Sequence, residues 1–354
     1  MAIVSIKNVK MAGIAACVPE RIEKNRDYTL LSPEEIEKYI ETTGVEERHC
    51  AVHDGSICTS DLCQKATEGL LEKLGWEKSD VDLIIFVSQT CDYRLPATAI
   101  VLQDKMGFPK STLAFDITLG CSGFVVGLGV IGNMISTGNF KKALLMVGNT
   151  QSEFANYHDK SMYFLLGDAG TVTALEYSET DADKIDLCYM TDGSGRRHVI
   201  VPDGGSRNRV NKKSFILEDV GDGNKRTRLD EKMDGIEVFA SAITGIPRLY
   251  KQLQLEFNIE NDKIDYCLIH QASKVLFEKL RKKMKFPEEK TPTNLRWFGN
   301  TSGSTLPLLM VTTLKKELES RKLEMVISAV GVGFSLGTGR ITTNKIKVCD
   351  LMYL

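Results

Sequence analysis

Runs of apolar residues with little polar alternation recur along the first half of the chain and predict buried strands. They occupy Ile3–Ile6, Val81–Ser88, Leu113–Ile117 and Ala143–Val147. Strands that are apolar on both faces indicate a sheet that is covered on both sides. Helical stretches lie between them, at Ser60–Leu74 and at the glycine-rich segment Gly123–Ser136. Alternating strands and helices predict an α/β fold.

The same succession of segments occurs twice, which predicts a duplicated domain. Four segments of the first half answer, in the same order and at nearly the same spacing, to four of the second: Val81–Phe86 to Ile264–Ile269, Lys105–Pro109 to Lys283–Pro287, Cys121–Phe124 to Thr301–Ser304, and Leu145–Gly148 to Ser328–Gly331. The period is far longer than that of solenoid repeats. We therefore expect an N-terminal half at residues 1–178 and a C-terminal half at 179–354, which opens with a polar insertion at about 179–232.

The composition is that of an ordinary soluble globular protein, and it narrows the possible functions. Of the 354 residues, 42% are hydrophobic, and the formal net charge is −2. A hydrophobic fraction of this size excludes a disordered chain. No apolar run reaches the roughly 18 residues that a membrane span needs, and the balanced charge gives no reason to expect a nucleic-acid partner.

Nine cysteines, scattered without the spacing of a disulfide framework, indicate free thiols and a cytoplasmic protein. The apolar stretch Met11–Val18 follows Lys7 and Lys10 and loosely imitates a signal peptide, but it is short and runs into Pro19. A strand that ends in a turn is the favoured interpretation.

Cys121 is the first candidate for chemistry. It lies in the turn between the predicted strand Leu113–Ile117 and the predicted helix that starts at Gly123. The dipole of a helix can depress the pKa of a thiol near its N-terminus, and the thiolate is the nucleophilic form. We therefore expect an activated nucleophile at this turn. The alternative is a small apolar core residue, the commonest role of a free cysteine.

His270 and Asn300 are the next candidates, because the repeat relates their positions to that of Cys121. His270 follows the strand Tyr266–Ile269, and the ends of buried strands are where α/β proteins place their sites. Asn300 lies in the turn that answers to the Cys121 turn. Equivalent turns of a duplicated fold converge, so we expect all three residues to meet. The alternatives are a buried structural histidine and a helix-capping asparagine.

Several weaker motifs are interpreted without a function of their own. The segment Gly331–Gly339 follows a buried strand, and its N–H groups can bind an oxyanion or simply form a tight turn. The Gly-x-Gly-x-x-Gly motif at Gly127–Gly132 lies inside a helix, so close packing explains it better than dinucleotide binding. The ligands between His49 and Cys63 match no zinc spacing, so we expect no metal. The basic stretch Arg207–Arg228 either binds an acidic carrier protein or nucleotide phosphates, or is a solvated insertion.

Taken together, these motifs resemble one family. The segments that contain the three candidate residues are Cys121–Phe124, His270–Ala272 and Gly299–Ser302. They resemble the Cys-His-Asn set of the β-ketoacyl-acyl-carrier-protein synthases III. Further matches are its Gly-Asp-Gly-Ala-Gly turn, its N-terminal Thr-Gly-Ile-x-x-Arg segment and its closing glycine loop, at Gly167–Gly170, Thr43–His49 and Gly333–Phe334. The resemblance covers nearly the whole chain. It implies the thiolase fold, with two βαβαβαββ halves in five αβαβα layers, and a homodimer.

The resemblance also implies a reaction. The Cys121 thiolate attacks an acyl thioester such as acyl-CoA, and the N–H groups of Cys121 and Gly333 hold the oxyanion. A malonyl thioester, malonyl-acyl carrier protein in this family, then loses CO₂, and the enolate attacks the acyl-enzyme to give a β-ketoacyl thioester. His270 and Asn300 donate hydrogen bonds to the enolate, since an amide cannot act as a base. Acyl-CoA is a substrate, and no metal or redox cofactor is implied.

The sequence departs from the family at positions that contact coenzyme A or the carrier protein. Lys38 and Thr42 stand where relatives carry a Trp and an Arg, and Ser273 and Val275 fall within the family's Gln-Ala-Asn-x-Arg segment. Val275 therefore puts carrier-protein docking in doubt. By the same resemblance, two residues belong to the acyl pocket: Phe334, and Leu95 by closing the pocket of a partner subunit.

Two other functions remain open at this point. The first is a thiolase-fold acyltransferase, which moves the acyl group to an amine or hydroxyl without forming a carbon–carbon bond. The second is a non-catalytic partner subunit, although such a subunit has no need of the complete Cys-His-Asn set.

Overall fold

The computed structural model describes all 354 residues and places them around two central sheets. The first sheet has the order β17-β2-β8-β7-β5-β6, with β18 also paired to β2. Its strands are β2 (Val9–Val18), β5 (Leu83–Val87), β6 (Leu113–Ile117), β7 (Lys142–Thr150), β8 (Asp168–Tyr177), β17 (Lys347–Val348) and β18 (Met352–Tyr353). The second sheet has the order β1-β9-β16-β15-β14. Its strands are β1 (Ala2–Ile6), β9 (Ile185–Thr191), β14 (Tyr266–Ile269), β15 (Lys322–Gly331) and β16 (Ser335–Asn344).

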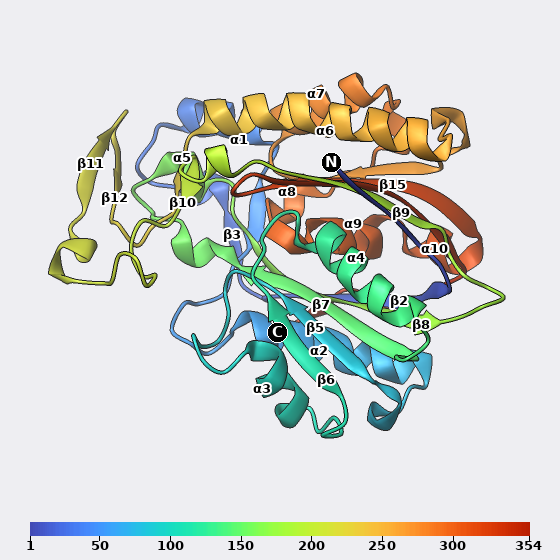
Figure 1. Ribbon diagram of the computed structural model, residues 1–354. Helices are drawn as coiled ribbons and strands as arrows, with labels where there is room; N and C mark the ends of the chain where they lie inside the picture. Colours follow the sequence, from blue (N-terminus) through green and yellow to red (C-terminus); the bar gives the residue numbers. More distant parts are fainter.

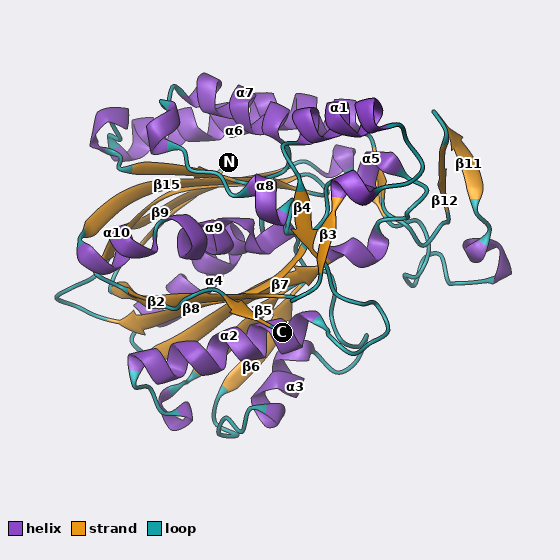
Figure 2. Cartoon of the chain, turned by 180° about the vertical axis from the view of Figure 1, so that it is seen from behind, coloured by secondary structure: helices purple, strands orange, loops and turns teal.

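Helices lie outside and between the two sheets, so that the molecule has five layers (Figure 2). One outer layer holds α2 (Thr59–Leu74) and α3 (Thr98–Lys105), and the other holds α6 (Gly235–Phe257) and α7 (Lys274–Met284), with α1 (Pro33–Thr43) beside α7. The middle layer holds α4 (Gly123–Ser136), α9 (Thr305–Thr313) and α10 (Lys315–Ser320). This αβαβα arrangement confirms the predicted thiolase fold.

The duplication is visible in the pairing of the strands. β5 runs parallel to β7 and β14 runs parallel to β15, while β8 and β16 return antiparallel beside β7 and β15. Each end of the chain joins the sheet of the other half. At the N-terminus β1 pairs with β9 of the second sheet, and at the C-terminus β17 and β18 pair with β2 of the first. The expected boundary at 178 falls in the loop between β8 and β9.

The polar insertion is narrower than the expected 179–232. β9 belongs to the second sheet, so the part outside the sheets begins after Thr191. It contains the short pair β10 (Val199–Ile200) and β13 (Lys232–Met233), and the hairpin of β11 (Glu218–Gly221) and β12 (Asn224–Arg226). The hairpin projects away from the layers (Figure 1).

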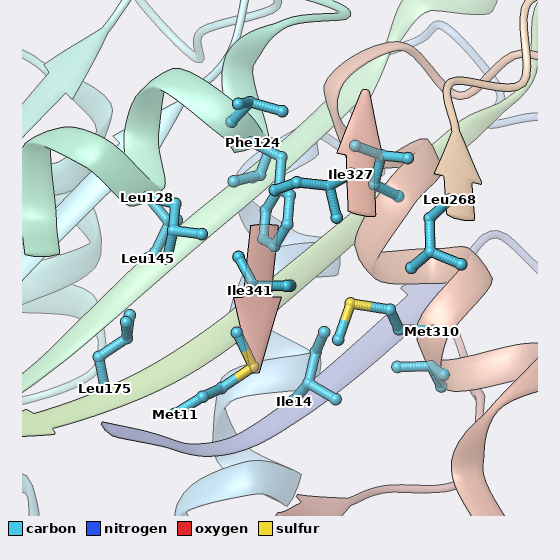
Figure 3. Packing of buried hydrophobic residues seen from close by; sticks show 14 of the residues in the cluster. Met11, Ile14, Phe124, Leu128, Leu145, Leu175, Leu268, Met310, Ile327 and Ile341 are labelled. Carbon is cyan, nitrogen blue, oxygen red and sulfur yellow. The ribbon is translucent and has the colours of Figure 1, made fainter. Parts of the chain in front are cut away.

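The apolar middle layer explains the glycine-rich helix. Phe124 and Leu128 of α4 pack between the two sheets with Ile327, Ile341 and other apolar residues (Figure 3). A Cβ on Gly127 would come within 2.8 Å of Leu145, and one on Gly129 within 1.9 Å of the Tyr189 hydroxyl. The glycines therefore serve close packing between the sheets, as the sequence predicted.

The segment between β2 and α2 forms the remaining wall of the molecule. It contains the hairpin of β3 (Ile22–Lys24) and β4 (Glu47–His49) and the helix α1. A capping box at Ser32 starts α1, and Gly44 ends it at a φ of 79°. The short helix α8 (Leu295–Phe298) lies against β4, and α5 (Lys160–Tyr163) reaches β3 through the hydroxyl of Tyr163, which donates to Glu23 at 3.0 Å.

Candidate active site

Cys121 occupies the turn between β6 and α4, as predicted. Gly120 packs directly against the Gln89 side chain, since a Cβ there would come within 2.1 Å of its Oε1 atom. The Sγ atom of Cys121 lies 3.8 Å from the Oγ atom of Ser302, in the equivalent turn of the second half. The two turns of the repeat therefore meet.

His270 continues β14 by one residue and is 3% exposed. Its main-chain N–H donates to the carbonyl of Ser328 at 2.8 Å, which keeps it in register with β15. Its Nδ1 atom lies 2.6 Å from the Thr305 hydroxyl. Burial lowers the pKa of His270 to about 4. The imidazole is therefore neutral at physiological pH.

Asn300 presents its amide NH₂ rather than its oxygen. The Oδ1 atom accepts a hydrogen bond from the main-chain N–H of Ser302 at 2.9 Å, which leaves Nδ2 free to donate. The main chain of Asn300 is held from both sides, by the carbonyl of Leu165 at 2.8 Å and by the N–H of Gly167 at 3.1 Å. Gly167 thus helps to position the asparagine; the turn predicted at Gly167–Gly170 is wrong, because Asp168–Gly170 are the first residues of β8.

One cavity brings the three side chains together. Its volume is about 200 Å³, and its wall includes Cys121, His270 and Asn300 together with mostly hydrophobic residues. Phe334 also lines it, as predicted. Leu95 does not: its side chain is 86% exposed on the loop before α3, and its role in a partner's pocket stays a prediction.

The predicted lowering of the Cys121 pKa is wrong for this cavity. Burial of the thiol raises its pKa to about 12, and the carboxylate of Glu231 raises it further, while the hydrogen bond with Ser302 acts in the opposite direction. A low-dielectric wall disfavours the thiolate more strongly than the start of α4 favours it. The resting cavity therefore holds a neutral thiol beside a neutral imidazole.

The two N–H groups predicted to bind an oxyanion have no acceptor within the protein. Neither the Cys121 nor the Gly333 main-chain N–H takes part in the hydrogen bonds of the turns and loops. Gly331 packs closely on the Cys121 turn, since a Cβ there would lie 3.0 Å from the Ser122 nitrogen. Val332 and Phe334 reach the cavity, but Gly333 itself is not part of its wall. Its role stays a prediction.

Arg48 of the Thr43–His49 segment connects that segment to a residue that lines the cavity. Its side chain is 1% exposed, pairs with Glu23 at 3.1 Å, and donates to Asn25 Oδ1 at 3.1 Å and to the carbonyl of Leu166 at 3.0 Å. Leu166 belongs to the cavity wall. The arginine therefore ties the N-terminal segment to a loop of the site.

The residues that depart from the family pattern lie on α1 and α7. Lys38 and Thr42 are exposed on α1, and Val275 is 49% exposed on α7. Ser273 accepts a hydrogen bond from the Leu276 N–H, which caps α7, and it also lines the cavity. Of these four residues, only Ser273 lines the cavity that holds Cys121, His270 and Asn300.

Sequence reasoning missed four polar residues of the site. Ser302 lies in the turn after Asn300, and Thr305 is the first residue of α9. Gln151 and Glu231 form a hydrogen-bonded pair in which Glu231 lines the cavity. The repeat itself signals the first two, since they follow directly on the Asn300 turn. Nothing in the sequence signals the second pair, because Glu231 falls in a polar stretch that reads as surface.

Two further observations concern metals and membranes. No group of three or more His, Cys, Asp and Glu side chains is arranged to hold a metal ion. None of the helices combines the length and the apolar character needed to cross a membrane.

Known proteins match this chain over nearly its full length. The family described as 3-oxoacyl-[acyl-carrier-protein (ACP)] synthase III matches residues 115–193, and its C-terminal domain matches residues 256–342. The crystal structure of a 3-oxoacyl-(acyl-carrier protein) synthase from Burkholderia xenovorans LB400 is 34% identical and has a TM-score of 0.93. The alignment covers 100% of this chain and 99% of that one. A solved 3-oxoacyl-(acyl-carrier-protein) synthase III is 32% identical with a TM-score of 0.89, over 94% of this chain and 99% of its own.

A curated relative gives the same result. The β-ketoacyl-[acyl-carrier-protein] synthase III of Koribacter versatilis is 28% identical over 340 residues, which is 94% of this chain and 97% of the relative. The names 3-oxoacyl and β-ketoacyl describe the same group. The chain belongs to the β-ketoacyl-acyl-carrier-protein synthase III family of condensing enzymes.

Proposed function

We propose that this enzyme loads an acyl group from an acyl thioester onto Cys121 and condenses it with a malonyl thioester to give a β-ketoacyl thioester. The observation that carries the proposal is the single cavity that holds a thiol, a neutral imidazole and an amide NH₂ that is free to donate. These groups suffice for acyl transfer and for stabilising an enolate.

The first half-reaction starts from the neutral thiol. When Nδ1 of His270 donates to the Thr305 hydroxyl, the Nε2 lone pair is free to take the Cys121 proton. The sulfur then attacks the thioester carbonyl, and the free N–H groups of Cys121 and Gly333 receive the oxyanion. Collapse breaks the carbon–sulfur bond of the donor, and the leaving thiolate takes the proton back from His270.

The second half-reaction needs donors instead of a base. The malonyl carboxylate leaves as CO₂, and the resulting enolate oxygen accepts hydrogen bonds from Asn300 Nδ2 and from an Nε2–H of His270. The enolate carbon attacks the acyl-enzyme carbonyl and forms the carbon–carbon bond. Cys121 leaves as a thiolate and takes up one proton from solvent, which its raised pKa favours.

This reaction is favoured over the two alternatives. Relatives that match nearly the full length are named β-ketoacyl-[acyl-carrier-protein] synthase III, and the Asn300 amide has a role in condensation that transfer to an amine or hydroxyl does not require. A non-catalytic subunit would have no use for the assembled thiol, imidazole and amide. The acyl donor is proposed to be acyl-CoA and the extender malonyl-acyl carrier protein, in a cytoplasmic homodimer with nine free cysteines.

The test is incubation with acyl-CoA and isotopically labelled malonyl thioester, followed by intact-mass and product analysis. We expect an acyl adduct that is absent from Cys121→Ala, together with labelled CO₂ and a β-ketoacyl thioester. An adduct that forms while the malonyl thioester stays unchanged would reject condensation in favour of another acyl transfer.

A further inference from the structure

A carboxylate that this reaction does not use lies in the wall of the same cavity. Glu231 directly precedes β13, is 7% exposed, and lines the cavity together with Cys121 and Asn300. Its main-chain N–H donates to the carbonyl of Phe154 at 3.0 Å, which fixes the segment in place. Of the 19 lining residues 13 are hydrophobic, so an ionised carboxylate is costly here unless it has a partner.

The protein supplies Glu231 with only one hydrogen bond. The Nε2 atom of Gln151 donates to Oε2 of Glu231 at 2.6 Å, and the Oε1 atom of Glu231 has no donor. Gln151 is itself 7% exposed, and its own carbonyl oxygen has no partner. No Lys, Arg or His side chain of the protein pairs with this carboxylate. The glutamine therefore orients Glu231 and leaves one of its oxygens available.

Two other buried carboxylates, those of Asp168 and Asp186, are satisfied by the protein. Asp168 accepts hydrogen bonds from the main-chain N–H groups of Ser152 and Ala51, both at 2.8 Å, and from the Ser152 hydroxyl at 2.6 Å. Asp186 accepts from Ser5 and pairs with Arg340. Asp159 has an Oδ2 atom without a hydrogen bond, but Arg226 lies 3.2 Å from it. Glu231 has neither a full set of hydrogen bonds nor a cationic partner, although it is almost as deeply buried.

The missing partner is therefore a ligand that carries a donor. We infer that Glu231 binds a hydroxyl or amino substituent on the acyl group, so that the enzyme selects acyl thioesters with such a substituent over plain saturated ones. The inference rests on the proposed loading of Cys121, because it assigns the chemistry of the acyl group that is loaded. Hydroxyl and ammonium groups share the ability to donate to a carboxylate, and they differ in charge.

The position of Glu231 favours the acyl group over the rest of the thioester. Glu231 lines the same cavity as Cys121, so its carboxylate faces the space in which an acyl group attached to the sulfur would lie. The coenzyme A part is identical in plain and substituted substrates. A difference in loading rate between them therefore reports on the acyl group alone.

The test compares loading rates of matched acyl-CoAs by intact-mass analysis of single turnovers. The set is butyryl-CoA with its 3-hydroxy, 4-hydroxy and 4-amino derivatives, and propionyl-CoA with its 3-amino derivative. We expect at least one substituted substrate to load ~10-fold or more faster than its plain counterpart, because a site built for a donor discriminates against analogues that lack it. Glu231→Leu should abolish or invert this ratio. Glu231→Gln should keep a preference for hydroxyl and lose any preference for the amine.

A matched control is available six residues along the chain. Glu237 is exposed on the first turn of α6 and does not line the cavity, so Glu237→Gln should leave the ratio unchanged. Ratios within one variant are independent of how much of that variant is folded.

Each contrary outcome has a distinct meaning. Equal loading of plain and substituted substrates by the native enzyme overturns the inference and leaves the proposed function standing. A fall in all loading rates by the same factor in Glu231→Leu also overturns it, because the carboxylate then acts on a part common to all thioesters. Failure of every acyl-CoA to modify Cys121 would reject the proposed function, and the inference with it.

Discussion

The Nδ1 atom of His270 lies 2.6 Å from Oγ1 of Thr305, and that hydroxyl is also 2.7 Å from the main-chain carbonyl of Ser302. A hydroxyl has one proton and can donate to only one of these acceptors. When it donates to Ser302, His270 carries its proton on Nδ1 and Nε2 is a base. When it donates to His270, Nε2 carries the proton and is a donor. The proposed loading step uses the first state and the proposed condensation uses the second; in the change between them Nδ1 gives one proton to solvent and Nε2 takes one proton from solvent.

Thr305→Val should therefore impair catalysis without removing a group that touches substrate. Valine has nearly the same shape but neither donates to nor accepts from Nδ1. The position of the His270 proton, on Nδ1 or on Nε2, is then no longer set by a hydrogen bond. We expect kcat for condensation to fall ~10-fold or more, with a changed pH profile, measured by β-ketoacyl thioester formation between pH 5 and pH 9. Thr305→Ser should restore most of the rate. An unchanged profile in the valine variant would show that the hydroxyl only fills space.

Asn300→Ala should separate the two half-reactions. The Asn300 amide donates to the enolate and has no part in loading, so the acyl adduct on Cys121 should form at a near-native rate. Condensation should fall ~100-fold or more, as is usual for loss of one preorganised donor. Intact-mass analysis measures the first step and product formation the second. Equal loss of both steps would contradict the role given to this amide.

The reactivity of Cys121 toward iodoacetamide should increase steadily with pH. Burial raises the pKa of the thiol to about 12, so the thiolate fraction is small at pH 7 and continues to grow above pH 9. The rate is followed by mass analysis, with Cys121→Ala as the control for the other thiols. Glu231→Gln removes a nearby negative charge and should therefore raise the rate at pH 8. A plateau already reached near pH 7 would show an activated thiolate instead.

Arg48→Met should destabilise the fold. The substitution leaves Asn25 Oδ1 and the Leu166 carbonyl without the donor that Arg48 supplies, while Glu23 keeps Arg21 and the Tyr163 hydroxyl. Two buried acceptors left unsatisfied cost about 2 kcal/mol or more in free energy of unfolding. Urea denaturation followed by circular dichroism measures the change. Arg26 forms exposed pairs with Glu37 and Glu46, so Arg26→Met is the matched control, with an expected loss below about 1 kcal/mol. Similar losses in both variants would argue against a supporting role for Arg48.

The sequence by itself determined the fold and the meeting of Cys121, His270 and Asn300. Apolar strands, a glycine-rich apolar helix and an internal repeat are local patterns, and in a duplicated α/β fold they require equivalent turns to converge. Cys121 and Ser302 lie at that convergence. The sequence could not determine how the ends of the chain are shared, because β1 and β17 are short and either sheet offers an edge of the same chemistry.

Tertiary structure alone decided the electrostatics of the site. The sequence placed Cys121 before a helix and predicted a lowered pKa, but the pKa depends on how much of the surroundings is protein rather than water, and burial raises it. The same holds for Glu231, which belongs to a polar stretch between the halves and is brought to the cavity only by the folding of that stretch against β7 and its following turn. The dielectric environment of a side chain and its hydrogen-bond partners depend on which residues surround it in space. The order of residues along the chain does not show these neighbours.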